Sequence, residues 1–315
     1  MTGTTPGGRV LVAGSANVDF VVRAPHIPAP GETVLGGDLA VVPGGKGANQ
    51  AVAAARAGGA DTAMLVALGN DPSAGVLEDS LRVAGVRIHL VRGARATGAA
   101  LITVSDGAEN AITVASGANG ELAPEHLPPL DGVAWLLLQL ETPLATVTAY
   151  ARAARAAGVR VMLNAAPAQA LPAELLGLLD LLVVNEEELT AIVGKDGSIA
   201  ERLSRTGAAA SVVTLGERGC CAVDGGRLIS QAAFTVAATD TTAAGDTFCG
   251  ALGAALAGGA DLTQALRRAA AAAALSATRP GAQTSIPTAA EVAAFLAHAA
   301  EADARTLAAY CGISE

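Results

Sequence analysis

The segment TDTTAAGDTFCGALGAAL (239–256) places two carboxylates and a glycine where a helix is expected to begin: Asp240, Gly245 and Asp246. At a helix start the free N–H groups point outward with the positive end of the helix dipole, so the amides of residues 243–246 would form an anion hole. Such a hole stabilises charge on a transferring phosphoryl group, and Asp246 would take the proton of the acceptor hydroxyl. The alternative is an ordinary helix N-cap, whose carboxylate bonds its own backbone.

Two further segments combine polar side chains with glycine. In GSANVDF, Asn17 and Asp19 offer the donors and acceptors that suit sugar hydroxyls, although ordinary Asx turns explain them as well. In VPGGKGANQA, Lys46 lies between glycines ahead of an alanine-rich helix, where a ligand can approach the main chain closely. Because Lys46 is followed by Gly47 and not by Ser or Thr, this is not a Walker A loop. A flexible turn is the structural alternative.

Polar residues also follow apolar stretches typical of strands, namely Glu141 in LQLETP, Glu188 in NEEEL and Thr214 in TLGERG. In open α/β sheets, ligands bind at the edge where parallel strands end. In a phosphoryl-transfer enzyme, Glu188 or its neighbours could hold water on Mg²⁺, while Thr214 and the nearby glycines could form a nucleotide shelf. The same residues also have structural explanations. The glutamates could be first-turn carboxylates that interact with a helix dipole, and TLGERG could be a glycine turn that enters a hairpin.

The composition is that of a globular protein with a large core. The chain has 315 residues, of which 51% are hydrophobic, 16% charged and only 2% aromatic, so the core must be built from Ala, Leu and Val. The net charge is −9 and there is no basic stripe, so nucleic acid is not an expected partner. A polyphosphate would have to be held by local N–H groups and a metal, because the overall field repels it.

The sequence predicts a cytoplasmic location. The cysteines form no C-x-x-C pair and indicate free thiols in a reducing compartment. The N-terminal segment MTGTTPGGRVLVAG lacks the features of a signal peptide, and no apolar run approaches the roughly 18 residues that a membrane helix needs. The four histidines are too dispersed in sequence to suggest a metal site.

Short β-branched runs alternate with alanine-rich helical stretches, which predicts βαβ units and a three-layer αβα, Rossmann-like fold around a mostly parallel sheet. The expected strands are 9–14, 62–70, 133–140, 159–165, 181–186 and 211–216. The expected helices are 47–59, 74–85, 143–157, 187–193, 198–207, a buried helix around 269–274 and a surface helix over 289–310. The polar residues at the carboxyl edge are Asn17, Glu141, Asn164, Asn185 and Thr214.

Two stretches break this alternation, at about 17–43 and 97–115. Both are expected to form antiparallel strands that stand off the main sheet, the second as a hairpin around Ser105-Asp106-Gly107. A small sheet inserted into one large domain (1–315) suggests a lid over the active site. Its outer apolar face would be exposed, which predicts a homodimer formed through the lid.

Eight motifs occur in one order from about residue 14 to 287: GSANVD, PAPGETV, PGGKGANQA, QLETP, NEEE, TLGERG, DTTAAGDTFCGAL and TRPGAQTSIP. Together they resemble the ribokinase-like carbohydrate kinase family. The resemblance implies the family's α/β fold with its lid, and transfer of the ATP γ-phosphate to the 5-hydroxyl of D-ribose. Mg²⁺ with ATP and an activating K⁺ are the implied cofactors.

Carried over by position, the resemblance implies that Asp246 is the base and that the amides of Ala243, Ala244 and Gly245 line the anion hole. The sugar-binding positions are Asn17, Asp19, Gly45, Lys46, Asn49, Glu141 and Asp246. The nucleotide-binding positions are Asn185, Thr214, Gly216, Gly219 and Gly245. Glu188 matches a position linked to Mg²⁺ through water. The positions of a loop pair that holds K⁺, mostly through backbone carbonyls, are Asp240, Thr242, Ser276, Arg279, Gly281 and Ser285.

The sequence departs from the family pattern at Cys249, where asparagine is frequent, and at Ala270, where a histidine can lie near adenine. Phe20 is the only aromatic residue of the expected lid, which disfavours a nucleoside, and Lys46 is the only cation within the pocket motifs, which disfavours a phosphorylated sugar. A small neutral polyol fits best. The alternatives are a kinase of the same fold for another sugar or a nucleoside, and a sugar-binding sensor without catalysis. A dinucleotide oxidoreductase is excluded because strand one lacks G-x-G-x-x-G.

Overall fold

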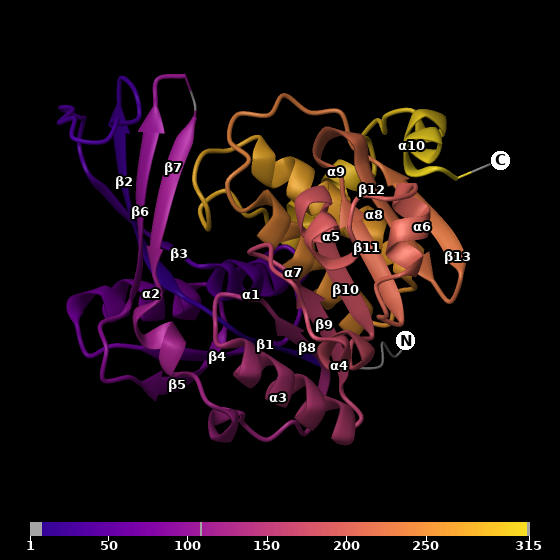
Figure 1. The fold of residues 1–315 in the computed structure, drawn as a ribbon, viewed down its shortest axis with the longest axis horizontal. Helices are drawn as coiled ribbons and strands as arrows, with labels where there is room; N and C mark the ends of the chain where they lie inside the picture. The colour runs from indigo at the N-terminus through magenta and orange to yellow at the C-terminus, as the bar shows by residue number, and fades with distance from the viewer. Residues whose placement is uncertain (1–7, 108, 314–315) are drawn as a thin grey trace.

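The fold is built on a nine-stranded sheet, seen in a computed structural model that describes residues 8–107 and 109–313 (Figure 1). The strand order is β13-β12-β11-β10-β9-β8-β1-β4-β5, and the strands from β11 to β5 run parallel. β12 and β13 add an antiparallel hairpin at one edge. The strands are β1 (Arg9–Ala13), β4 (Thr62–Leu68), β5 (Arg87–Arg92), β8 (Val133–Leu138), β9 (Arg160–Asn164), β10 (Leu181–Asn185), β11 (Ala210–Thr214), β12 (Gly219–Asp224) and β13 (Arg227–Ala232).

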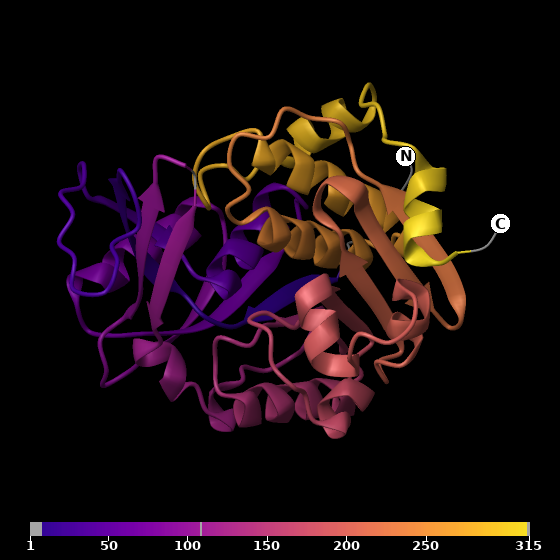
Figure 2. The ribbon, with the colours of Figure 1, turned by 45° about the horizontal axis from the view of Figure 1, so that its top comes forward.

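Helices cover both faces of this sheet, as the αβα prediction requires, and Figure 2 shows α7 to α9 and α3 to α6 on opposite sides. Strand residues alternate between two hydrophobic cores, so that Val10 and Val12 face one and Leu11 and Ala13 the other. The first core contains α1 (Lys46–Arg56), α2 (Pro72–Val83), α7 (Ala244–Ala257), α8 (Leu262–Ala277) and α9 (Ala289–Leu296). The second contains α3 (Leu144–Ala156), α4 (Ala173–Gly177), α5 (Glu186–Val193), α6 (Ile199–Ser204) and α10 (Ala304–Cys311).

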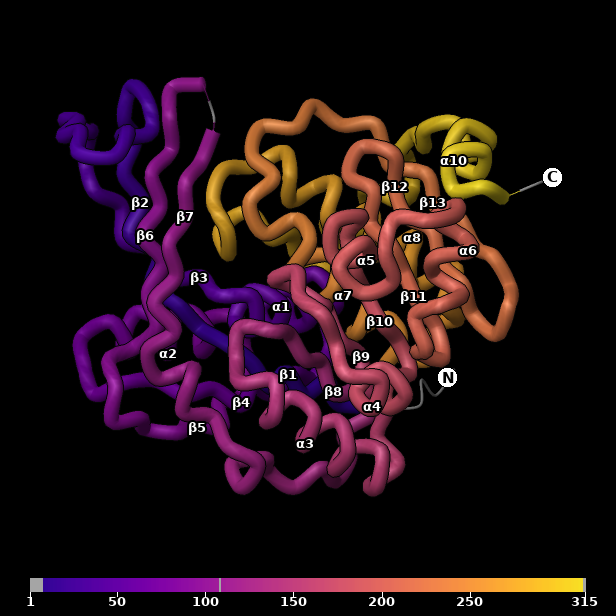
Figure 3. The backbone as a smooth tube through the Cα atoms, in the orientation of Figure 1, coloured from indigo at the N-terminus to yellow at the C-terminus, as the bar shows by residue number. Residues whose placement is uncertain are grey.

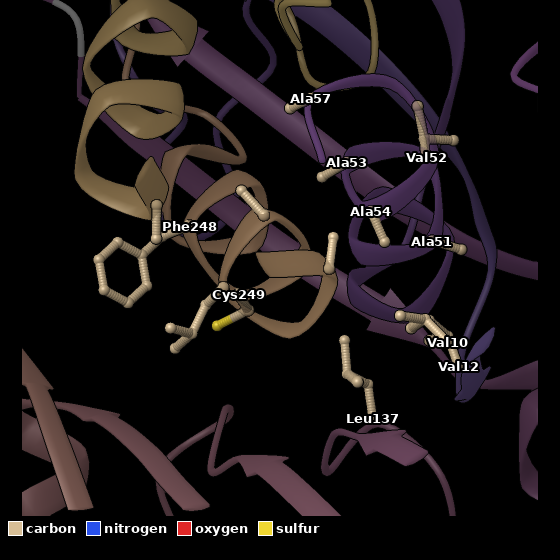
Figure 4. Close-up of a cluster of buried hydrophobic side chains, with 14 of the residues drawn as sticks. Val10, Val12, Ala51, Val52, Ala53, Ala54, Ala57, Leu137, Phe248 and Cys249 are labelled. Carbon is tan, nitrogen blue, oxygen red and sulfur yellow. The ribbon is translucent and has the colours of Figure 1, made fainter. Parts of the chain in front are cut away.

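Helices α1 and α7 pack very closely because small residues, and few aromatic ones, lie between them. Figure 4 shows small side chains such as Ala53 and Ala54 of α1 beside α7, which contributes Phe248 and Cys249. A Cβ added at Gly250 would stand 2.4 Å from the carbonyl oxygen of Gln50, so the two backbones approach where no side chain intervenes. This contact brings the first turn of α1 beside the first turn of α7.

A second sheet of four strands, in the order β3-β2-β6-β7, stands off the main body (Figures 1 and 3). Its strands are β2 (Asn17–Ala24), β3 (Ala40–Gly44), β6 (Gly98–Ser105) and β7 (Asn110–Ala115). The predicted location is therefore confirmed, but the all-antiparallel pairing is wrong because β2 and β6 run parallel. The long connection through α1, β4, α2 and β5 permits that direction, whereas a short turn would not.

The predicted helix over 289–310 is also wrong, because the segment forms two helices, α9 and α10. The Asp303 carboxylate accepts from the Arg305 backbone N–H at 2.9 Å and begins α10 afresh. Leu307 and Cys311 then bury α10 in the second core. No helix within 8–107 or 109–313 has the length and apolarity to span a bilayer. The segment expected to lack a signal peptide includes residues 1–7, which lie outside the described residues.

Candidate active site

The carboxylate of Asp246, in the first turn of α7, is held by two side-chain amides from α1. Asn49 Nδ2 donates to Oδ2 at 3.0 Å, and Gln50 Nε2 donates to Oδ1 at 3.0 Å. Asp246 is 8% exposed, and the N-cap position of α7 belongs to Ala243, which makes no side-chain cap hydrogen bond. Neither carboxylate oxygen bonds the start of its own helix, so the N-cap alternative does not describe Asp246.

The main-chain amides beside Asp246 are mostly free. Ala243 has φ 59°, a left-handed conformation that turns the chain sharply into α7. The expectation that all the amides of 243–246 are free is wrong for Ala244, whose N–H donates to the Thr241 carbonyl at 3.1 Å as part of this turn. Among the described residues, no acceptor faces the N–H groups of Ala243, Gly245 and Asp246. These three donors are therefore available to an anion.

Asn17 and Asp19 lie two residues apart on β2 and so share one face of the lid sheet. No donor from the described part of the chain reaches the Asp19 carboxylate, although Asp19 is only 9% exposed. Burial, with the nearby charges of Glu141 and Asp246, raises the pKa of Asp19 to about 7. An acceptor without a protein partner is suited to ligand hydroxyls.

Glycines 44 and 45 allow β3 to approach β2 at this point. A Cβ at Gly44 would stand 2.1 Å from Asp19 Oδ2. Gly45 has φ 88°, and a Cβ there would stand 2.6 Å from the backbone nitrogen of Asn17. Both positions therefore require glycine, whereas a flexible turn would accept other residues there.

Lys46 is half-buried among carboxylates. The charge of Asp246 raises the pKa of Lys46, burial opposes that effect, and Glu141 and Glu188 add to it. The Glu141 carboxylate accepts from the Ser15 hydroxyl at 2.5 Å and from the Lys46 backbone N–H at 3.1 Å. The sequence motifs that carry these residues thus converge on one place, next to Asp246.

A cavity of about 410 Å³ opens between the lid sheet and the main sheet. Its lining combines predicted and unpredicted residues: Asn17, Val114, Ser116, Asn119, Gly120, Leu140, Glu141, Thr142, Pro143 and Pro167. Asn119 is the main residue that sequence reasoning missed. Its Nδ2 donates to Asn17 Oδ1 at 2.8 Å, and its Oδ1 accepts from the Ala16 backbone N–H at 3.0 Å, so it fixes the start of β2. The glycine-flanked SGANGE segment was the available signal.

The predicted nucleotide residues lie on two neighbouring loops, since Asn185 and Thr214 are register partners at the ends of β10 and β11. Asn185 and Glu188 form a reciprocal capping box at the start of α5, with distances of 2.7 and 2.8 Å. Burial raises the pKa of Glu188, while the Asn185 N–H and Lys46 lower it. Gly216 (φ 57°) and Gly219 (φ 112°) shape the second loop.

The sequence of residues 8–289 matches the family model described as pfkB family carbohydrate kinase. The chain belongs to this family. It is 40% identical over 306 residues to a ribokinase of Haemophilus influenzae, and the aligned region covers 92% of this chain and 99% of that protein. A ribokinase structure from Thermotoga maritima is 35% identical with a TM-score of 0.87, covering 92% of this chain and 100% of that one. A structure of Arabidopsis thaliana ribokinase complexed with ribose and ATP is 30% identical with a TM-score of 0.83, covering 93% and 99%.

The family resemblance and the predicted fold are confirmed, and the chain is a carbohydrate kinase of the pfkB family. Its two departures from the family pattern belong to the first core. Cys249 is fully buried in α7, and burial together with Asp246 raises its pKa well above the ordinary thiol value. Ala270 is half-buried on α8.

The two loops predicted to hold a monovalent cation in this pfkB-family kinase lie together. The Asp240 carboxylate accepts from the backbone N–H groups of Thr242 at 2.9 Å and Gly281 at 2.8 Å, which lowers its pKa against the effect of burial. The hydroxyls of Ser276 and Ser285 bond each other at 2.7 Å. The Arg279 side chain turns away to Glu291 at 2.7 Å. Backbone carbonyls are therefore the groups left to bind a cation here.

Helix α10 lies beyond the residues that the pfkB family model matches, and it contacts the two loops that are predicted to bind nucleotide. The Tyr310 hydroxyl donates to Glu186 Oε1 at 2.7 Å, and the Arg218 guanidinium carbon lies 4.5 Å from the Tyr310 ring centroid. Glu186 follows β10 and Arg218 follows β11, so Tyr310 ties the two loops together. The sequence carried no signal for this contact.

Proposed function

We propose that this chain transfers the γ-phosphate of ATP to the 5-hydroxyl of D-ribose, giving ribose 5-phosphate and ADP. One observation carries the proposal: both oxygens of Asp246 are held by α1 amides, away from the free N–H groups of its own helix. A base and an anion hole thus lie side by side without blocking each other. The ribokinases at 30 to 40% identity support ribose as the acceptor.

In the proposed reaction, Asp246 takes the proton of the acceptor hydroxyl. The hydroxyl oxygen forms its bond to the γ-phosphorus while the bond from that phosphorus to the β–γ bridging oxygen breaks, and ADP leaves. The amides of Ala243, Gly245 and Asp246 stabilise the charge on the transferring group. Ala244, which was expected to contribute, already donates to Thr241 and serves to shape the turn.

We assign sugar binding to the predicted residues around the lid. The Asp19 carboxylate has no donor among the described residues, and Asn17, Lys46, Asn49 and Glu141 supply the mixture of donors and acceptors that ribose hydroxyls need. Gly45 lets the chain close tightly against this group. We propose that the four-stranded sheet acts as a lid within one domain of 1–315, and that closure excludes water as a competing acceptor.

We assign the nucleotide to the loops after β10 and β11, with Asn185, Thr214, Gly216 and Gly219, and to Gly245. Apart from its chain neighbours and its own helix backbone, no atom of the described residues lies within 4 Å of a Cβ built at Gly245, which leaves room for phosphates. Glu188 suits Mg²⁺ held through water, because its Oε2 accepts from the Asn185 N–H while its Oε1 has no donor among the described residues. Bound Mg²⁺ neutralises charge between the β- and γ-phosphates.

We propose a K⁺ site between the loops of residues 240–242 and 276–285. Its implied positions are Asp240, Thr242, Ser276, Arg279, Gly281 and Ser285. The side-chain pairing already described leaves carbonyl oxygens as ligands, a donor set suited to a weakly hydrated monovalent cation and not to a transition metal.

We propose a homodimer formed through the lid. Val41 and Leu101 are 47% and 59% exposed and share the lid face of Phe20. Ile112 and Val114 are 54% and 46% exposed and share the opposite face with Asp19. Exposed apolar strands on both faces are commonly covered by a partner. Four buried free thiols support a cytoplasmic location.

The test is a coupled ADP-release assay with ATP across D-ribose, 2-deoxyribose, other pentoses and adenosine, with and without K⁺. We expect D-ribose to give the highest kcat/KM. A higher value for another sugar or for a nucleoside would favour the alternative kinase. Calorimetry that shows ribose binding without any ADP release would favour the sugar sensor.

A further inference from the structure

The two amides that hold Asp246 are themselves each held by a glutamine. Gln139 Nε2 donates to the side-chain Oε1 of Gln50 at 2.7 Å. Gln283 Nε2 donates to the side-chain Oδ1 of Asn49 at 3.1 Å. Each oxygen of the Asp246 carboxylate is thus the end of a chain of two side-chain amides. The outer amide of one chain follows β8, and the outer amide of the other chain lies in the loop after α8.

These outer glutamines determine which way the inner amides face. A side-chain amide can present either its NH₂ or its C=O group, and an ionised carboxylate only accepts hydrogen bonds. A flipped Gln50 or Asn49 would therefore set oxygen against oxygen. Because Gln139 and Gln283 donate to the two side-chain carbonyl groups, the NH₂ groups point at Asp246. Gln50 Nε2 also donates to Asn164 Oδ1 at 3.1 Å, which opposes a flip of Gln50 as well. All four amides are at most 6% exposed, which leaves little room for water to replace them.

Gln139 carries an unfavourably buried oxygen atom. Its Oε1 atom is buried and has no hydrogen-bond partner within the described residues, a situation that normally destabilises a fold. The chain leaves space for this oxygen at Gly14, where a Cβ would stand 1.9 Å from it. Exceptions of this kind are expected where function and not stability selects the residue.

We propose that Gln139 and Gln283 are positioning residues for phosphoryl transfer, acting through Gln50 and Asn49. An aspartate in the first turn of a helix would otherwise bond the free N–H groups of that turn. The amide chains hold Asp246 away from those groups and thereby keep them available for the γ-phosphoryl. This inference rests on the proposed function, because it requires Asp246 to act as the base.

The test compares isosteric methionine variants of the intact enzyme. Gln139→Met keeps the side-chain length and removes both the hydrogen bond to Gln50 and the unpaired oxygen. We expect kcat to fall about 3- to 10-fold, with the KM for ribose unchanged and the melting temperature not lowered. Gln50→Met is expected to lower kcat about 10- to 100-fold, since it removes a bond to a charged group.

A double-mutant cycle separates positioning from packing. If Gln139 acts only through Gln50, the double variant Gln50→Met/Gln139→Met has the same kcat as Gln50→Met alone. Gln231→Met is the control, because Gln231 is also buried but lies on β13 and bonds Ala232 and Glu301. It is expected to keep the wild-type kcat.

Additive effects in the cycle, or a wild-type kcat in Gln139→Met, would overturn the inference. Should Gln139→Met fail to fold, Gln283→Met tests the same claim at the other oxygen, with the same expected fall in kcat. One outcome rejects only the positioning role: the wild type phosphorylates ribose, Asp246→Asn does not, and the glutamine variants are unaffected. A wild type that transfers no phosphate to ribose rejects the proposed function, and this inference with it.

Discussion

The Asp19 carboxylate fills the space in front of Gly44 where a side chain would begin, since a Cβ at residue 44 would stand 2.1 Å from Asp19 Oδ2. The two residues lie on adjacent antiparallel strands of the lid sheet, whose register pairs Asn17 with Gly44. The position of the Asp19 carboxylate, which is proposed to bind sugar, therefore depends on the absence of a Cβ atom at residue 44 on the neighbouring strand.

Gly44→Ala is expected to displace Asp19 and raise the KM for ribose about 10- to 100-fold, the loss expected for hydrogen bonds to a charged group. The KM for ATP should stay unchanged. Steady-state kinetics with each substrate varied in turn measures both values. Gly37→Ala is the control on the same lid, because the nearest atom to its Cβ would be the Arg23 carbonyl oxygen at 3.8 Å. Equal effects of the two variants would contradict this role of Gly44.

Asp19→Asn is expected to stabilise the protein in a pH-dependent way. The pKa of Asp19 is raised from 3.8 to about 7, first by burial and then by Glu141 and Asp246, so the folded state binds more protons than the unfolded state between these values. Stability therefore falls as pH rises from about 4 to about 7, by up to about 4 kcal/mol. Thermal melts should show a gain for Asp19→Asn at pH 8 that disappears near pH 4. The same gain at both pH values would exclude this titration.

Asp246→Asn is expected to keep the fold and ribose binding but to lower kcat by about 10²- to 10⁴-fold, because no group remains to accept the hydroxyl proton. Circular dichroism and ribose calorimetry measure the fold and the binding, and a coupled assay measures kcat. Asp261→Asn is a matched control, since Asp261 caps α8 and asparagine caps equally well. An unchanged kcat in Asp246→Asn would remove the proposed base.

Asp240→Asn is expected to weaken the link between the two proposed cation loops, because an asparagine can accept from only one of the two amides of Thr242 and Gly281. The K⁺ concentration for half-maximal activity should rise about tenfold. Activity should also fall when K⁺ is exchanged for Na⁺ or a bulky organic cation. Equal wild-type rates in all three salts would contradict the K⁺ assignment.

Tyr310→Phe is expected to raise the KM for ATP about 3- to 10-fold and to leave the KM for ribose unchanged, because the loops after β10 and β11 lose a shared hydrogen bond. Tyr150→Phe provides the control, since its hydroxyl donates to the Ala123 carbonyl and contacts neither of these loops. If both variants change the KM for ATP equally, Tyr310 has no specific effect on the nucleotide loops.

Much of the parallel core could be predicted from local patterns. Apolar β-branched runs such as 181–186 and 211–216 match β10 and β11 closely because strands buried on both faces need such residues. Strand β5 was missed because Arg87, His89 and Arg92 interrupt its apolar residues at the open edge of the sheet. The break before α10 had a signal in Asp303, but the alanine-rich surroundings favoured one continuous helix.

The candidate site was predictable wherever a motif combined glycine with a polar residue at a strand end, as for Asn17, Lys46 and Glu141. Gln139 and Gln283 had no such signal. A single amide in a strand or loop is common, and its importance here depends on which residues from other elements lie opposite. The direction of pairing between β2 and β6 is also a tertiary property, because long connections permit both directions.

The contact between Gly250 and the carbonyl of Gln50 affects any effort to engineer this enzyme. Replacing glycine by alanine inside a helix usually improves stability by about 0.5–1 kcal/mol. At position 250, however, the added carbon would push α1 away from α7. It would thereby separate Asn49 and Gln50 from Asp246. Stabilisation programmes that fill helical glycines by rule would therefore lose both stability and turnover at Gly250, whereas Gly75, with open space around it, can be filled freely.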